Sequence, residues 1–258
     1  TCKTTYQSSD RIVEKSVFAY DTERPYNIIS KSSLCSGGAE QVERTYYSNN
    51  TIPDKESLTT SQRSAIQLLT SRNYLTTPVQ QTMEKKDKRL YSVLRGYSSS
   101  LSSGMVVEDQ YYCKGTDKYE KRISYNKYDI YGNPVYINKD GAEKVVYLWG
   151  YKGQYLLAEI KGATYEEVKK ALMVDPASMS SCILPSMPLY LDMIDNLYKA
   201  LPSALITSYT YHPLIGISGI ISPNKAKTTF EYNSDSQLIR IKDTEGKTME
   251  EYQYHFRP

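Results

Sequence analysis

Histidine, phenylalanine and tryptophan are scarce in this sequence. The chain of 258 residues has two histidines (His212 and His255), three phenylalanines and one tryptophan. Two histidines do not suffice for a metal enzyme built on a histidine cluster. Zinc motifs, phosphate-binding loops and nucleophile elbows are also missing. The sequence therefore predicts no metal site, no cofactor and no catalytic residue, and we expect a protein that is not an enzyme.

Long apolar runs and an excess of one charge are missing too. No stretch reaches the roughly 18 apolar residues that a membrane-spanning helix needs. The 32 lysines and arginines nearly balance 29 aspartates and glutamates, which argues against a dedicated nucleic-acid binder. The first residues show neither an initiator methionine nor a signal-peptide pattern. We therefore expect a piece of a longer chain.

The chain has four cysteines, and none is part of a CxxC pair. They are Cys2, Cys35, Cys113 and Cys182. A zinc knuckle is therefore not expected. Free, mostly buried thiols are the simpler interpretation, since cysteine is among the most buried residue types. Disulfides in an oxidising compartment, with three full pairings to choose from, stay open as the alternative.

Tyrosine is the abundant aromatic residue, with 26 copies. Its apolar body and polar tip suit strands in thin sheets with wet faces. Alternating patterns predict strands at 11–20, 41–47, 105–113 and 119–128, with a charged hairpin tip at 84–89 and a mobile loop at 98–104. We therefore expect a mainly β protein, an antiparallel ribbon or curved sheet.

Three segments have helical periodicity, and we expect them to be inserted into the sheet. The first covers 58–72, with Ala65, Ile66 and Leu69 on one face and Ser61 as its cap. The second covers 164–173 and opens with a capping box between Thr164 and Glu167. The third covers 188–201, with Ser186 as its cap and an apolar stripe that includes Leu191, Ile194, Leu197, Tyr198 and Leu201.

A strand–turn–strand unit occurs twice. Residues 128–137 read YDIYGNPVYI, and residues 232–241 read YNSDSQLIRI. The residues that define the turn are Tyr128, Asp129, Gly132 and Asn133 in the first copy and Tyr232, Asn233 and Ser236 in the second. Asp129 suits the start of a type I turn, and Gly132 suits the positive φ that follows it. The repeat therefore predicts that Gly132 and Ser236 share a backbone position with positive φ.

These turns, together with the segments 123–164, 207–217 and 228–256, resemble the RHS/YD-repeat family of bacterial secreted or cell-surface proteins. The match is to the C-terminal region of such proteins and covers about half of the chain. The resemblance implies a long ribbon of antiparallel strands that spirals into a shell in related proteins. It suggests a divergent, strand-rich segment with one helix at 1–117 and a repeat-like region at 118–258 with a helix pair inserted at 164–201.

The resemblance implies a function as well. We expect a non-enzymatic structural or adhesive module of a larger surface protein, located at the cell surface, attached to the outer membrane, or outside the cell. Its expected partners are the rest of the parent chain, glycans, or further copies of the chain that associate through bare sheet edges. A carbohydrate-binding module is the alternative, and a shell around a toxin is the third interpretation.

One aromatic cluster is a candidate ligand platform. Tyr147, Trp149 and Tyr151 are separated by single residues, so a strand would place them on one face. Such a platform could stack on sugar rings. Packing within a tyrosine-rich sheet is the competing interpretation. His212, His255 and the paired acids Asp192 and Asp195 have no recognisable partners in the sequence, and we expect them to be structural or exposed.

Overall fold

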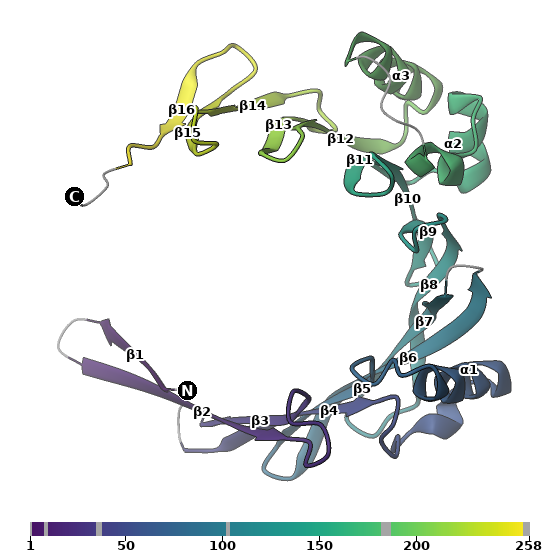
Figure 1. Cartoon of the computed structure of the whole chain (residues 1–258), viewed down its shortest axis with the longest axis vertical. Helices are drawn as coiled ribbons and strands as arrows, with labels where there is room; N and C mark the ends of the chain where they lie inside the picture. Colours follow the sequence, from purple (N-terminus) through teal and green to yellow (C-terminus); the bar gives the residue numbers. More distant parts are fainter. Residues whose placement is uncertain (1, 8–9, 35–37, 102–103, 182–186, 255–258) are drawn as a thin grey trace. The chain divides into compact units, whose positions relative to one another are not determined.

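The protein is mainly β, as the sequence predicts, and its strands are antiparallel. A computed structural model describes residues 2–7, 10–34, 38–101, 104–181 and 187–254. The chain divides into two compact units, Thr1–Tyr125 and Asn126–Pro258. Figure 1 shows the order of the elements along the chain. The division at 117/118 that the sequence suggests stays a prediction.

The first unit is a ribbon of antiparallel strands, each of which pairs with the next one in the sequence. The strands are β1 (Cys2–Gln7), β2 (Asp10–Tyr20), β3 (Ile28–Leu34), β4 (Glu40–Tyr47), β5 (Pro78–Lys85), β6 (Lys88–Leu101), β7 (Gly104–Lys114) and β8 (Glu120–Tyr128), of which β8 continues into the second unit. The charged segment between β5 and β6 is a tight hairpin, as expected. Lys86 and Asp87 both have positive φ there, which is the geometry of a type I′ turn.

One helical insertion covers a face of this ribbon. It contains the 3₁₀ turn η1 (Lys55–Ser57) and helix α1 (Thr60–Ser71). The predicted apolar face of α1 is confirmed, since Ala65, Ile66 and Leu69 are buried. They pack with Val79 and Leu94 of the sheet in one core cluster.

Two local expectations for this unit are wrong. Thr59, not Ser61, caps α1: its side chain accepts a hydrogen bond from the Gln62 amide in a reciprocal capping box. The serine-rich segment 98–104 is expected to be a mobile loop, but its described residues, 98–101 and 104, belong to strands β6 and β7. Strand β6 continues to Leu101, which pairs with Gly104. Serines can extend a strand where the neighbouring strand supplies the hydrogen bonds, and their composition does not reveal that partner.

The second unit continues the same strand-by-strand pairing. Its further strands are β9 (Pro134–Lys139), β10 (Glu143–Gly150), β11 (Tyr155–Lys161), β12 (Leu205–His212), β13 (Gly216–Ile221), β14 (Lys227–Tyr232), β15 (Leu238–Lys242) and β16 (Thr248–Glu251). Between β11 and β12 lie α2 (Tyr165–Leu172), the 3₁₀ turn η2 (Pro176–Ser181) and α3 (Met187–Ala200). The capping box of Thr164 and Glu167 forms as predicted. Ser186 lies outside the described residues.

The core of this unit lies between the helices and β10–β12. Val168, Ile194 and Leu197 of the helices contribute to the same buried cluster as Leu148 and Ile160 of the sheet. Leu191, predicted in the apolar stripe of α3, is instead 38% exposed. Tyr190 takes the buried place. Its hydroxyl donates to the carbonyl of Leu157 at 2.7 Å, or to that of Tyr209 at 3.0 Å.

Candidate functional site

The repeated turns are the most regular local structures in the chain. In the turns 129–133 and 233–237, the first residue donates its amide to the carbonyl of the fifth, and the fourth donates its amide to the carbonyl of the first, all at 2.9 to 3.2 Å. The side-chain oxygen of the first residue also accepts the amides of the third and fifth residues, at 2.8 to 3.0 Å. A single Asp129 or Asn233 side chain therefore satisfies two turn amides that would otherwise lack a partner.

The fourth position of these turns has positive φ in both copies. Gly132 has φ of 85° and Ser236 has φ of 61°. The prediction that these two residues share one backbone conformation is therefore confirmed. Glycine adopts it freely, whereas serine, which has a Cβ, is strained there.

A third copy of the turn follows at 243–247. The carboxylate of Asp243 accepts the amides of Glu245 and Lys247 at 3.0 and 2.9 Å, and Gly246 has φ of 81°. Only two copies of the turn are expected from the sequence, and this one is not among them. The signal that identifies this copy is an Asp three residues before a Gly and ten after Asn233. A fourth turn, 222–226, repeats the main-chain bonds with Lys225 at φ of 65°.

The first turn is also fastened to its surroundings. Asp129 is 2% exposed. Asn133 donates its side-chain amide to the carbonyl of Gly153 at 2.8 Å, or to the second oxygen of Asp129 at 3.0 Å. A Cβ on Gly153 would lie 2.6 Å from that same nitrogen. The tyrosines that precede the turns are half-buried, and Tyr232 donates its hydroxyl to the Ile217 carbonyl at 2.9 Å.

The structure does not gather the predicted aromatic platform on one surface. Tyr147 and Trp149 are half-buried in β10 and alternate with the buried Leu148, so they lie on the sheet face opposite the helices. Trp149 donates its indole N–H to the Pro134 carbonyl at 2.8 Å. Tyr151, in the following turn, packs against the helix-side core.

Another tyrosine cluster surrounds Tyr151. The rings of Tyr151 and Tyr155 meet edge to face with centroids 5.0 Å apart, and Tyr155 and Tyr211 are 4.6 Å apart. Tyr211 donates its hydroxyl to the Leu156 carbonyl at 2.7 Å. Burial raises the pKa of Tyr211 to about 12. The sequence does not reveal this cluster because Tyr211 is far from the other two along the chain.

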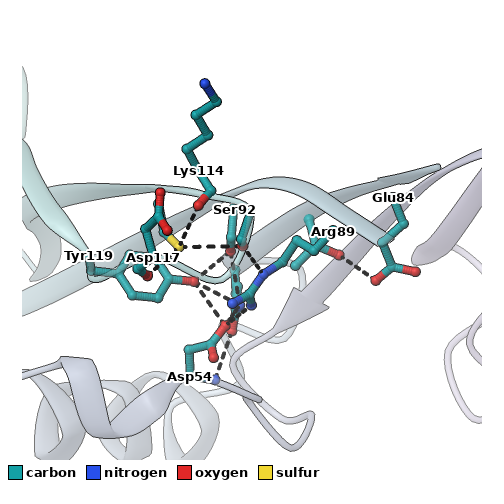
Figure 2. A network of polar contacts seen from close by, with 11 residues as sticks. Asp54, Glu84, Arg89, Ser92, Lys114, Asp117 and Tyr119 are labelled. Carbon is teal, nitrogen blue, oxygen red and sulfur yellow. Dashed lines mark hydrogen bonds and ion pairs between the residues drawn. The ribbon is translucent and has the colours of Figure 1, made fainter. Parts of the chain in front are cut away.

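A polar network ties η1 to the sheet of the first unit (Figure 2). Arg89 donates to the carboxylate of Asp54 at 2.6 Å and to the Gly115 carbonyl at 2.7 Å. Tyr119 donates to the same carboxylate oxygen at 2.9 Å, or to Ser92 at 2.6 Å. Sequence reasoning missed this network because its members come from segments far apart in the sequence, around residues 54, 89–92 and 115–119. Asp54, Arg89, Ser92 and Tyr119 all find partners within the protein, so we interpret the network as structural.

Two titratable side chains at this network, Tyr119 and Cys113, have raised pKa values. Burial raises the pKa of Tyr119, and its hydrogen bond to the Asp54 carboxylate raises it further. Burial also raises the pKa of the Cys113 thiol. Cys113 is free and buried, as the sequence suggests. Cys35 and Cys182 lie outside the described residues. A buried thiol with a raised pKa is a poor nucleophile.

The other residues that the sequence singles out stand apart from one another. His212 is exposed, and its ring contacts the Tyr232 ring edge to face, with centroids 6.3 Å apart. Asp192 and Asp195 are exposed on α3. His255 lies outside the described residues. Within the described ranges, no three His, Cys, Asp or Glu side chains come together as a metal site, and no helix is long and apolar enough to cross a membrane.

Comparisons with known proteins give only distant structural matches. The sequence matches no family model, and no curated protein is significantly similar to it. The solved structures that match include "Crystal Structure of TcdB2-TccC3", with 12% identity over 88% of this chain and a TM-score of 0.33. A Tc holotoxin pore from Photorhabdus luminescens matches with 11% identity over 92% of this chain and a TM-score of 0.35. The chain spans 12% of the length of each of these two. These similarities assign the chain to no family.

Proposed function

We propose that the chain is a non-enzymatic structural segment of a longer YD-repeat protein. The observation that carries this proposal is the turn that recurs at 129–133, 233–237 and 243–247 with the same main-chain and side-chain hydrogen bonds. A repeated local unit whose strands pair only with their sequence neighbours can be extended without changing its interior. Such a unit suits a scaffold.

The C-terminal strands support this interpretation. In β14, β15 and β16 every residue is half-buried or exposed, and all four residues of β16 are exposed. A ribbon with so thin a core gains from neighbouring strands, because its outer edge presents unpaired amides and carbonyls. The remainder of the parent chain is the partner that we propose. We also propose, as a second use, that the same strand edge binds further copies of the chain.

The absence of catalytic chemistry is part of the proposal. Cys113 is buried with a raised pKa, and the imidazole of His212 contacts an aromatic ring. The Cys113 thiol donates to the main-chain carbonyl of Asp117 at 2.8 Å rather than to an acid or base side chain. We therefore expect no turnover of peptides or glycans, and no effect of His212→Ala in any such assay.

The experiment is to identify the native polypeptide. Antibodies against this chain would be used to probe cell, surface and culture fractions of the source organism. We expect a band far heavier than the 29.5 kDa of this chain, outside the cytoplasm and accessible to protease on intact cells. A single cytoplasmic band near the mass of the chain would overturn the proposal.

A carbohydrate-binding module has less support. The indole N–H of Trp149 is already bonded to the Pro134 carbonyl, and Tyr151 packs against the core. These two residues are thus engaged internally. Glycan binding that is lost in Tyr147→Ala and Trp149→Ala would favour this alternative over a purely structural role.

A further inference from the structure

A groove of about 550 Å³ lies beside α3 in the second unit. Its volume falls within the roughly 300–1,000 Å³ of small-molecule sites. Leu191 of α3 lines one side, and Ile221, Phe230 and Ile239 of the neighbouring strands line the rest together with polar residues. Leu191 is more than a third exposed, although it is the residue that the periodicity of α3 assigns to the core. The groove therefore exposes apolar surface to water.

Three of the hydroxyl groups that line the groove are engaged within the protein. Tyr232 donates its hydroxyl to the Ile217 carbonyl, and Ser218 donates to Thr210 at 3.0 Å. Two glycines permit this packing. A Cβ on Gly216 would lie 2.6 Å from the Tyr232 hydroxyl oxygen, and one on Gly219 would lie 2.8 Å from the Thr210 hydroxyl oxygen. A ligand would thus meet aliphatic carbon together with His212 and Thr229, which also line the groove.

The charges at the groove are unequal. Glu231 lines it, but Lys242 and Arg240 both bind this carboxylate. Lys227 also lines it and makes no ion pair with any residue that the structure describes. The backbone of Lys227 is fixed by Thr244, whose hydroxyl oxygen accepts the Lys227 amide at 2.7 Å. The groove therefore combines an apolar lining with one unbalanced ammonium group.

We propose that this groove binds a small aliphatic carboxylate, with the carbon chain against Leu191 and against Ile221, which pairs with Lys227 and so shares its face of the sheet, and the carboxylate beside the ammonium of Lys227. The apolar lining supplies affinity through buried area. The single unpaired cation supplies the preference for an anionic head group. This site is independent of the proposed scaffold function, because a structural segment can carry it or lack it.

The experiment measures binding of decanoate, below its micelle concentration, to the chain of residues 1–258 by isothermal titration calorimetry. Decan-1-ol and decyltrimethylammonium serve as matched ligands of zero and positive charge. We expect saturable binding of decanoate to one site, weaker binding of the alcohol, and no binding of the cation. Affinity for decanoate should fall as salt is added, because the ammonium is exposed to solvent.

Two variants locate the site. Lys227→Met should lower the affinity for decanoate about five- to tenfold and leave the affinity for decan-1-ol unchanged. Leu191→Asp places a negative charge beside the groove at an exposed position of α3. It should lower the affinity for decanoate as well. Lys247→Met, at an exposed lysine of the third turn, and Leu68→Asp, at a similarly exposed leucine of α1, are the matched controls.

The proposal is overturned if decanoate does not bind, or if the alcohol binds as well as decanoate. It is overturned equally if Lys227→Met and Leu191→Asp bind decanoate as the unmodified chain does. Circular dichroism of each variant shows whether the chain is folded. If Leu191→Asp is unfolded, the affinities of Lys227→Met for decanoate and for decan-1-ol decide whether the proposal holds.

Discussion

The fourth residue of each repeated turn lies in the left-handed region of backbone space, where a Cβ costs roughly 1–2 kcal/mol. We expect Gly132→Ala to lower the free energy of unfolding by about that amount. Nothing lies within 4 Å of the Cβ that it would add, so the loss reports backbone strain alone.

In the second copy of the turn, we expect a change in the free energy of unfolding of opposite sign for the same reason. Ser236 has φ of 61°, so Ser236→Gly should stabilise the protein, by less than about 1 kcal/mol because glycine also gives the unfolded chain more freedom. Urea denaturation of both variants measures the two changes. Changes of the same sign would show that strain at this position does not govern these turns.

The first residue of the turn acts through its side chain. Asp129→Ala removes the acceptor of the Tyr131 and Asn133 amides at a buried position. We expect a loss of about 2–4 kcal/mol, since a buried donor without a partner costs about 1–3 kcal/mol. Asp129→Asn should cost less, because Asn233 makes the same two bonds in the second copy. Denaturation curves in which both variants lose equally would contradict this account.

At the scale of elements, the position of α1 depends on a glycine in the strand beneath it. A Cβ on Gly96 would lie 2.4 Å from the side-chain carbon Cδ of Gln62, which is 1% exposed. We expect Gly96→Ala to destabilise the first unit by about 1–3 kcal/mol, the usual cost of overpacking. The side-chain amide of Gln62 also donates to Glu108 and Asp109 at 2.9 and 3.0 Å. These hydrogen bonds restrain the side chain from moving away from the added Cβ.

A double-mutant cycle is the measurement. Gln62→Ala removes the obstructing atoms, so Gly96→Ala should cost much less in that background than in the unmodified chain. Equal costs in the two backgrounds would show that the contact between α1 and β6 does not depend on this glycine.

The start of α2 should respond to pH. The hydrogen bond from the Thr164 amide lowers the pKa of the Glu167 carboxyl. A carboxyl group whose pKa is lower in the folded state than in the unfolded state stabilises the folded state at pH values above its unfolded-state pKa. That contribution disappears as pH falls through the folded value. We expect amide exchange in the first turn of α2 to lose relative protection below about pH 4.5, the ordinary value. Glu167→Gln keeps a capping partner without the titration and should abolish that pH dependence.

The elements that the sequence predicts are those whose signals are local. The capping box of Thr164 and Glu167, the apolar face of α1 and the repeated turns each depend on residues within a few positions of one another. The network around Asp54 and the burial of Tyr190 depend on partners from distant segments. Leu191 shows the same limit: periodicity assigns it to the apolar stripe, but the sheet beneath it ends in a groove rather than a core.

At the scale of the whole molecule, each unit has a core built from its own residues. The cluster around Leu94 belongs to Thr1–Tyr125, and the cluster around Ile160 belongs to Asn126–Pro258. Antiparallel pairing of sequence neighbours keeps most contacts local, which favours folding of separate segments. Within each unit the strands pair in the order in which they occur in the sequence.

We expect residues 126–258 to fold when expressed alone. The buried cluster of this segment draws on β10–β12, α2 and α3, all within it. Trp149, the one tryptophan of the chain, is bonded to Pro134 in the same segment, so its fluorescence reports this unit directly. A cooperative urea transition of that fluorescence is the expected result. Ile160→Ala, at a fully buried position, should lower the free energy of unfolding by about 2–5 kcal/mol. A gradual transition that Ile160→Ala leaves unchanged would show that this core does not fold without residues 1–125.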